Sequence, residues 1–254
     1  MTSEASAIRC RVARIEQCNQ RGGRTLTLVD LIEAGTVSLD MAAYLAAVVA
    51  CGHSLLVGAN PGGAGKTTVM AALLAFLPPG CAIEAVADRR ALVAAAHDHA
   101  YGETCYLAHE VGAGSYYAYV WGADARAFFA LAGRGHIIAT NLHADTLAET
   151  RTQLCDENGV APSDLQAVTL KLYLRLYRGR GWYVDRRVSH VYESDGQRDR
   201  LIWTHSAAGG FRREASSAVV SVAAVQVCRA FLAALLEAGT RELAPLVTEV
   251  FSRV

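Results

Sequence analysis

The chain has 254 residues, of which 52% are hydrophobic and 19% are charged, so its composition is globular and excludes intrinsic disorder. Lys and Arg together number 24, as do Asp and Glu, and this zero net charge argues against a dedicated nucleic-acid binder. Seven widely spaced cysteines without a C-x-x-C pair are typical of reduced thiols, not of a zinc site. The N-terminus lacks the apolar segment of a secretory signal, so we expect a cytoplasmic protein.

The first 25 residues are polar and contain five arginines, and they predict at most a strand or a flexible lead-in. From residue 26 onward, short apolar runs bounded by turn residues predict strands at 54–57, 81–85, 105–109, 115–121 and 137–141. Helix-forming stretches lie before and between them, at 26–34, 39–51, 66–77, 90–97, 124–131 and 146–154. Strands that alternate with helices predict an α/β fold with a mostly parallel sheet.

The second half of the chain adds further elements at 165–176 and 188–193. The stretch 206–217 is typical of a linker before a small C-terminal helical region, with helices at 218–238 and 242–251. The apolar stretch 41–51 is too short to span a bilayer, and 218–238 is interrupted by Gln226 and Arg229. Both stretches therefore predict buried or amphipathic helices. A protein with such helices could still dock on a membrane-bound machine.

A glycine-rich loop follows the strand predicted at 54–57. Its residues are Asn60, Pro61, Gly62, Gly63, Ala64, Gly65, Lys66, Thr67 and Thr68. This segment matches the phosphate-loop pattern G-x-x-x-x-G-K-[ST] except at the first glycine, where Asn60 stands. The three glycines allow the positive φ values that turn N–H groups inward, and Asn tolerates that conformation next best.

The helix expected at Lys66 would point its free N–H groups at bound phosphates. Lys66 would then reach the β- and γ-phosphates, and the Thr67 hydroxyl would ligate Mg²⁺. The loop therefore predicts a site for ATP with Mg²⁺, but it does not name the reaction.

Four further segments follow one another in a characteristic order. They are an approach to the loop at 28–45, the acidic stretch AIEAVAD at 82–88, GH at 135–136 with NLHADT at 141–146, and RRVSHVYE at 186–193. Over about residues 26–205 the chain resembles the type II/type IV secretion ATPase family, the RecA-like motors of pili, secretion systems and archaella. The resemblance implies a RecA-like P-loop NTPase core at 26–205, with a lead-in at 1–25 and a linker and C-terminal helices at 206–254.

The resemblance also implies roles for individual residues. Glu84 would be the carboxylate of the acidic box, near the attacking water or the metal. His143 would sense the γ-phosphate or couple it to movement, and His136 is a second candidate for which a structural role is equally suitable. The position of His143 after an apolar strand favours function.

A motor of this kind needs a second acid, at the end of a second strand, and two alignments supply different residues for it. In the first, Glu110 ends the strand at 105–109 and an insertion follows. In the second, the ungapped match of VWGADA at 120–125 puts Tyr119 in the position of the glutamate. A tyrosine, with an ordinary pKa of about 10, cannot act as a carboxylate at neutral pH. We favour Glu110, and the Tyr119 alignment stays open.

Members of the family carry a separate N-terminal domain that completes the nucleotide site between hexamer subunits, and only about 25 residues precede the core here. We expect a homo-oligomer such as a hexamer, or a hetero-complex that supplies the domain, at the cytoplasmic face of a membrane secretion or pilus protein. Arg9, Arg11 and Arg14 are candidates for an arginine finger, with a solvated basic tail as the alternative. Basic residues also gather between 171 and 213, but the zero net charge favours a solvated face over a nucleic-acid site.

The leading hypothesis is an ATP-hydrolysing motor subunit of a secretion or pilus-type machine. The alternative is a hydrolysis-deficient nucleotide-binding partner of such a machine, which Tyr119 and the short N-terminus would suit. A DNA translocase is a third and weaker hypothesis, and it predicts hydrolysis stimulated by DNA.

Overall fold

The computed structural model describes residues 2–19, 22–60, 62–178 and 184–253. Within them, nine strands form one sheet in the order β2-β3-β5-β1-β6-β7-β8-β9, with β4 beside β3. The parallel part consists of β1 (Leu55–Gly58), β2 (Ala82–Ala85), β3 (Thr104–Val111), β4 (Tyr119–Val120), β5 (Ile137–Leu142) and β6 (Leu170–Arg178). The antiparallel part continues from β6 through β7 (Val184–Ser194), β8 (Asp199–Ser206) and β9 (Gly210–Arg213). The predicted α/β fold with a mostly parallel sheet is confirmed, and the antiparallel extension adds to it.

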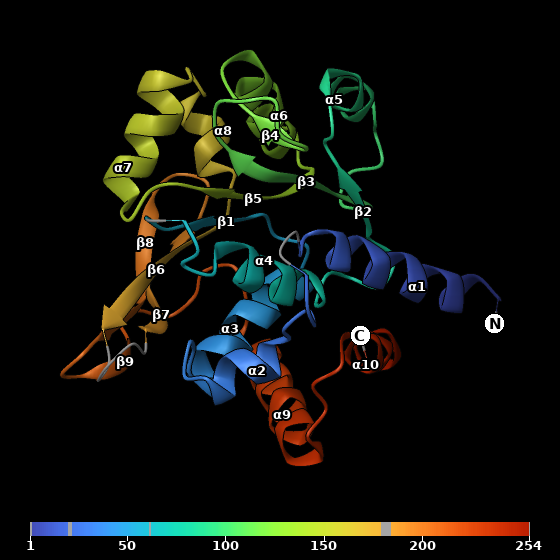
Figure 1. Cartoon of the computed structure of the whole chain (residues 1–254), viewed down its shortest axis with the longest axis vertical. Helices are drawn as coiled ribbons and strands as arrows, with labels where there is room; N and C mark the ends of the chain where they lie inside the picture. The colour runs from blue at the N-terminus through green and yellow to red at the C-terminus, as the bar shows by residue number, and fades with distance from the viewer. Residues whose placement is uncertain (1, 20–21, 61, 179–183, 254) are drawn as a thin grey trace.

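Helices cover both faces of the sheet (Figure 1). One face carries α5 (Arg89–Ala96), α6 (Ala123–Gly133), α7 (Leu147–Arg151), the π-helical turn η1 (Thr152–Glu157) and α8 (Pro162–Gln166). The other face carries α1 (Thr2–Gln17), α2 (Leu28–Glu33), α3 (Leu39–Ala50), α4 (Lys66–Leu74), α9 (Val222–Ala238) and α10 (Leu243–Arg253). In the part of the chain described, no helix is both long and apolar enough to cross a bilayer.

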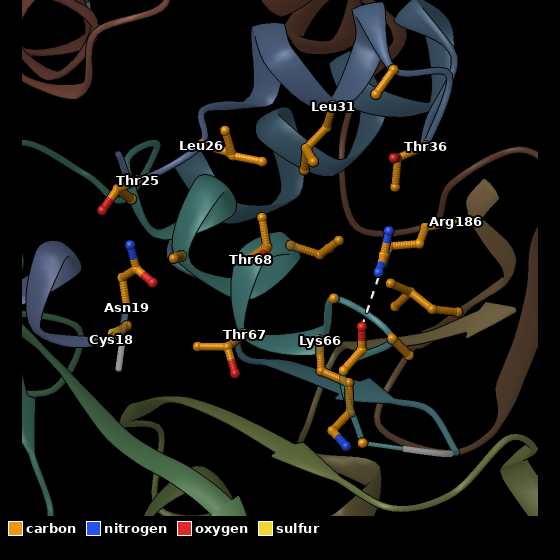
Figure 2. Close-up of a pocket in the computed structure, with 18 of the residues that line it drawn as sticks. Cys18, Asn19, Thr25, Leu26, Leu31, Thr36, Lys66, Thr67, Thr68 and Arg186 are labelled. Atoms are coloured by element: carbon orange, nitrogen blue, oxygen red, sulfur yellow. Dashed lines mark hydrogen bonds between the residues drawn. The ribbon is translucent and has the colours of Figure 1, made fainter. Parts of the chain in front are cut away.

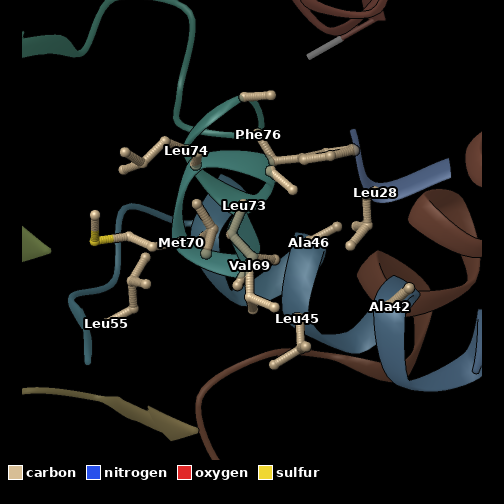
Figure 3. Packing of buried hydrophobic residues seen from close by; sticks show 14 of the residues in the cluster. Leu28, Ala42, Leu45, Ala46, Leu55, Val69, Met70, Leu73, Leu74 and Phe76 are labelled. Carbon is tan, nitrogen blue, oxygen red and sulfur yellow. The ribbon is translucent and has the colours of Figure 1, made fainter. Parts of the chain in front are cut away.

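Each face of the sheet has its own hydrophobic core. In the central strand β1, Leu55 and Val57 belong to the core beneath α3 and α4, whereas Leu56 belongs to the core beneath α6 and α8. Successive side chains of a strand point to opposite faces, which is why this strand is apolar throughout. Figure 3 shows Leu45 of α3 close to Val69 of α4 in the first of these cores. This packing holds α4, and with it the loop that precedes it, against the sheet.

The N-terminal segment differs from the prediction of a strand or a flexible lead-in, because it forms the helix α1. Ile8, Val12 and Ile15 recur at the spacing of one helix face, and all three pack on the core beneath the sheet. The arginines between them obscure this pattern in the sequence. One of these, Arg11, is itself buried.

The stretch 206–217, predicted to be a linker, instead contains the end of β8 and the whole of β9. The two strands form a hairpin whose register pairs Ser206 with Gly210, and Gly210 has a φ of +63° that suits glycine. Helix α9 then begins at Val222, four residues later than the predicted position 218, and Ser221 is its N-cap. Leu232 of α9 and Leu246 of α10 join the same core as α3, so the C-terminal helices pack on the sheet domain.

Arg11 connects α1 to the segment between α4 and β2 through hydrogen bonds. Its side chain is 3% exposed, and its guanidinium donates hydrogen bonds to the carbonyl oxygens of Leu77 at 2.6 Å and Cys81 at 2.8 Å. The guanidinium also lies 4.5 Å from the ring centre of Phe251 in α10. Burial lowers the pKa of Arg11 to about 10, which leaves the side chain charged at neutral pH.

We expect Arg11→Ala to lower the free energy of unfolding by about 3 kcal/mol, because it leaves buried carbonyl groups without donors. Urea denaturation followed by circular dichroism measures this change. Arg9→Ala is the matched control, since Arg9 is exposed on the same helix, and it should cost no more than about 0.5 kcal/mol. Equal losses in the two variants would contradict this role of Arg11.

Candidate functional site

The loop between β1 and α4 lies at the carboxyl end of the parallel strands, where ligands bind in open α/β sheets. Gly58 ends β1, and a Cβ atom there would come within 2.5 Å of the Ala144 carbonyl oxygen, so only glycine fits. Gly63 and Gly65 have φ values of +87° and +100°, as a phosphate loop requires. Gly62, for which the same conformation was predicted, has no positive φ. The predicted loop residue Pro61 lies outside the described residues.

Lys66 opens α4, and its side chain is 6% exposed. Its Nζ donates a hydrogen bond to the Ala59 carbonyl oxygen at 3.2 Å and lies 3.6 Å from Glu110 Oε1. His143 completes the group, with Nε2 2.5 Å from Glu110 Oε1 and Nδ1 3.4 Å from Lys66 Nζ. Three predicted site residues, from the loop, from β3 and from the end of β5, therefore meet at one point.

The two alignments assign the second acid to different residues, Glu110 and Tyr119. In the structure these two residues lie next to each other. Strand β4 pairs in parallel with β3, and Tyr119 stands opposite Glu110 in the register. The Tyr119 hydroxyl donates a hydrogen bond to Glu110 Oε2 at 3.3 Å. Burial, and then the charge of Glu110, raises the pKa of Tyr119, so the phenol stays a donor at neutral pH. Tyr119 thus contacts the carboxylate and does not displace it.

Asn141 and Asp145, to which the sequence assigned no role, also contact the loop region. Asn141 is fully buried in β5, and its Nδ2 donates to the His109 carbonyl oxygen at 2.8 Å and to Thr67 Oγ1 at 3.5 Å. Its Oδ1 is buried without a hydrogen-bond partner among the described residues. Asp145 Oδ1 accepts a hydrogen bond from the Asn60 N–H at 2.6 Å. A polar side chain inside an apolar strand is the signal that would have singled out Asn141.

Mg²⁺ prefers oxygen ligands, usually one or two from the protein together with water and phosphate. Thr67 supplies a hydroxyl at the start of α4, Glu110 supplies a carboxylate, and the uncommitted Oδ1 of Asn141 is a further oxygen in the same region. This donor set fits Mg²⁺ bound together with nucleotide phosphates, with Thr67 as the predicted protein ligand.

A cavity of about 730 Å³ opens beside the loop (Figure 2). Gly62, Gly63, Ala64, Gly65, Lys66, Thr67 and Thr68 line it, together with Glu110, Tyr119 and His143. The opposite wall consists of the segment after α1, which includes Asn19, Thr25 and Leu26, and Arg186 and Arg187 of β7 close one side. The cavity is large enough for a nucleotide, because ligand pockets usually measure about 300–1,000 Å³.

Other predicted residues lie elsewhere. Glu84 is not among the residues that line the cavity; its half-exposed side chain lies in β2 and pairs with Arg14 of α1 at 3.4 Å. His136 precedes β5, at the end of that strand opposite to His143, and its buried ring lies 3.2 Å from the Asp98 carbonyl oxygen. Glu84 and His136 therefore lie outside the group formed by Lys66, Glu110 and His143, and their predicted roles stay predictions.

No family model matches the chain, and no curated protein sequence matches it. Among solved structures, it is similar to the VirB11 ATPase from the Brucella suis type IV secretion system in complex with sulphate, at 20% identity and a TM-score of 0.44. It is also similar to the Legionella pneumophila ATPase DotB, at 11% identity and a TM-score of 0.39. These matches cover 65% and 90% of this chain, and 54% and 62% of the other two. The chain therefore spans less than two thirds of the length of each.

Proposed function

We propose that the chain binds ATP with Mg²⁺ and hydrolyses it, as a motor subunit of a secretion or pilus-type machine. The observation that carries this proposal is the meeting of Lys66, Glu110 and His143 beside a glycine-rich loop that begins a helix. A loop of this kind suffices for phosphate binding, whereas a carboxylate beside it, near the end of a second strand of the same sheet, is what hydrolysis needs.

In the proposed reaction, the N–H groups of the loop and Lys66 Nζ hold the β- and γ-phosphates. Glu110 accepts a proton from the water that attacks the γ-phosphorus, and the bond from that phosphorus to the ADP oxygen breaks. Bound Mg²⁺, with Thr67 as a ligand, would neutralise charge on the phosphate oxygens. His143 contacts both Lys66 and Glu110, so it is placed to respond when Lys66 moves from Glu110 to the phosphate.

The alternative function is that of a hydrolysis-deficient nucleotide-binding regulatory partner. The observation that favours it is the engagement of Glu110 on both oxygens, with His143 and Lys66 at Oε1 and Tyr119 at Oε2. A carboxylate that keeps these partners when ATP is bound would be a weaker base towards a water molecule, because three groups already share its negative charge. ATP would then bind without turnover.

We further propose that the protein acts in the cytoplasm as a homo-oligomer, such as a hexamer, or in a hetero-complex that completes the nucleotide site. Of the predicted arginine-finger candidates in the N-terminal helix, Arg11 is buried and Arg14 pairs with Glu84. Arg9 is exposed, and none of the three is among the residues that line the cavity, so none of them would act as an arginine finger in the site of its own chain.

The purified protein should bind ATP in the presence of Mg²⁺ and release phosphate. A fluorescent ATP analogue measures binding, and a coupled phosphate assay measures turnover across a range of protein concentrations. Chelation of Mg²⁺ by EDTA should abolish turnover, because the metal neutralises the phosphate charge. Binding without turnover at every concentration would support the regulatory alternative, and the absence of binding would contradict both functions.

A further inference from the structure

Strand β7 places an arginine directly over the glycine-rich loop. Arg186 stands opposite Leu176 of β6 in the antiparallel register, near the start of β7. Its Cδ lies 3.4 Å from the point that a Cβ atom on Gly65 would occupy. Figure 2 shows its guanidinium turned towards the loop, where Nε donates to the Gly63 carbonyl oxygen at 3.4 Å. The side chain therefore covers the part of the loop next to Lys66.

The other cations that line the cavity are already paired with carboxylates. Arg24 donates to Asp30 at 2.6 Å and 2.9 Å, Lys66 lies 3.6 Å from Glu110, and Arg187 lies 3.5 Å from Asp185. Each pair reduces the charge that its cation can offer to a ligand.

Arg186 differs from these cations, because no carboxylate of a described residue lies within 4 Å of its guanidinium. Its hydrogen bonds to the carbonyl oxygens of Gly63 and Val184 are 3.4 Å and 3.5 Å long, at the weak end of the range. The exposed guanidinium can therefore exchange these bonds for better ones at little cost.

We propose that Arg186 is a second phosphate-binding residue of the nucleotide site, supplied by the same chain; this inference rests on the proposed ATP binding. A guanidinium is always charged, and its planar fork matches two phosphate oxygens. Lys66 reaches the phosphates from inside the loop and Arg186 from the β7 side, so the phosphate chain is held between two cations. Arg186 takes up this contact by giving up its long bond to Gly63.

The test is the affinity for ATP and ADP, measured by isothermal titration calorimetry for the wild type and three variants. Arg186→Ala should bind both nucleotides about tenfold or more weakly, as expected for loss of a charge-assisted hydrogen bond. Arg186→Gln should be equally weak, because glutamine can still donate to Gly63 but carries no charge. Arg175→Ala, which removes an exposed arginine from the neighbouring strand β6, should bind like the wild type.

Unchanged affinity in Arg186→Ala, or affinity restored by Arg186→Gln, would overturn the inference while leaving ATP binding in place. An equal loss in Arg175→Ala would overturn it too, since the effect would then be one of overall charge. Failure of the wild type to bind ATP would overturn the proposed function and this inference with it. Thermal melting of each variant separates a local loss of binding from a loss of folding.

Discussion

Glu110→Gln should reduce ATP turnover by about 10²- to 10⁴-fold, the usual contribution of a general base. Glutamine has nearly the same shape, but it cannot accept the proton of the attacking water. It also lacks the negative charge that holds Lys66 at 3.6 Å, so ATP affinity should be unchanged or slightly higher. Single-turnover phosphate release measures the first effect, and titration with ATP in the presence of Mg²⁺ measures the second.

Glu84→Gln is the matched control, since it is the same substitution on the adjacent parallel strand. The family resemblance assigns a catalytic carboxylate to Glu84, whereas in the structure this side chain pairs with Arg14 outside the cavity lining. We therefore expect turnover of Glu84→Gln within about twofold of the wild type, because exposed ion pairs contribute little. If Glu84→Gln instead lost turnover and Glu110→Gln kept it, the assignment of the base to Glu110 would be wrong.

The sequence identified the loop and the strand ends beside it because these features depend on local patterns. A strand, glycines and a Lys-Thr pair at fixed spacing are visible in the sequence, and the carboxyl ends of parallel strands must share an edge. His143 was singled out by the family resemblance, and its position after an apolar strand favoured that choice. The role of Asn141 was missed, because its hydrogen bond to the His109 carbonyl depends on β5 lying beside β3.

The choice between Glu110 and Tyr119 could not be made from the sequence, because an alignment assigns one residue to each position. In the structure both candidate residues lie at the site. The segment after β3 turns back and forms β4 beside β3, and this pairing puts Tyr119 opposite Glu110. Ala118 makes this return with a φ of +55°, a conformation that is rare for alanine and that local propensity does not predict. The pairing of β3 with β4 therefore places the two candidates side by side, and the assignment of the second acid stays a prediction.

The arginines illustrate a second limit of the sequence. In the N-terminal segment they suggested a solvated tail, yet Arg11 is buried against carbonyl groups that lie more than sixty residues away in the chain. In the C-terminal half they suggested a solvated face, and Arg186 is exposed as expected, but it also contacts the Gly63 carbonyl oxygen of the loop. Charge alone does not distinguish a solvated arginine from one that contacts a distant backbone, because the difference depends on tertiary packing.

Lys66→Ala should weaken ATP binding by about 30-fold to 4,000-fold and bring turnover below detection, because removing one partner of a buried charge contact costs about 2–5 kcal/mol. Lys66 is buried and opens α4, so the protein cannot readily replace its amine with another cation. The fluorescent analogue and the phosphate assay measure both effects. Thermal melting shows whether the fold is kept, as we expect, since His143 still pairs with Glu110.

The double variant Lys66→Ala with Glu110→Gln separates two causes of that loss. Lys66→Ala removes a phosphate contact, but it also leaves the Glu110 charge less compensated, and that charge would repel the γ-phosphate. If repulsion were the cause, the added Glu110→Gln change would restore ATP affinity. We expect affinity to stay low in the double variant, because the amine itself holds the phosphates. Recovery to the wild-type value would show that Lys66 serves to neutralise Glu110, and the loop would then lack its central phosphate-binding side chain.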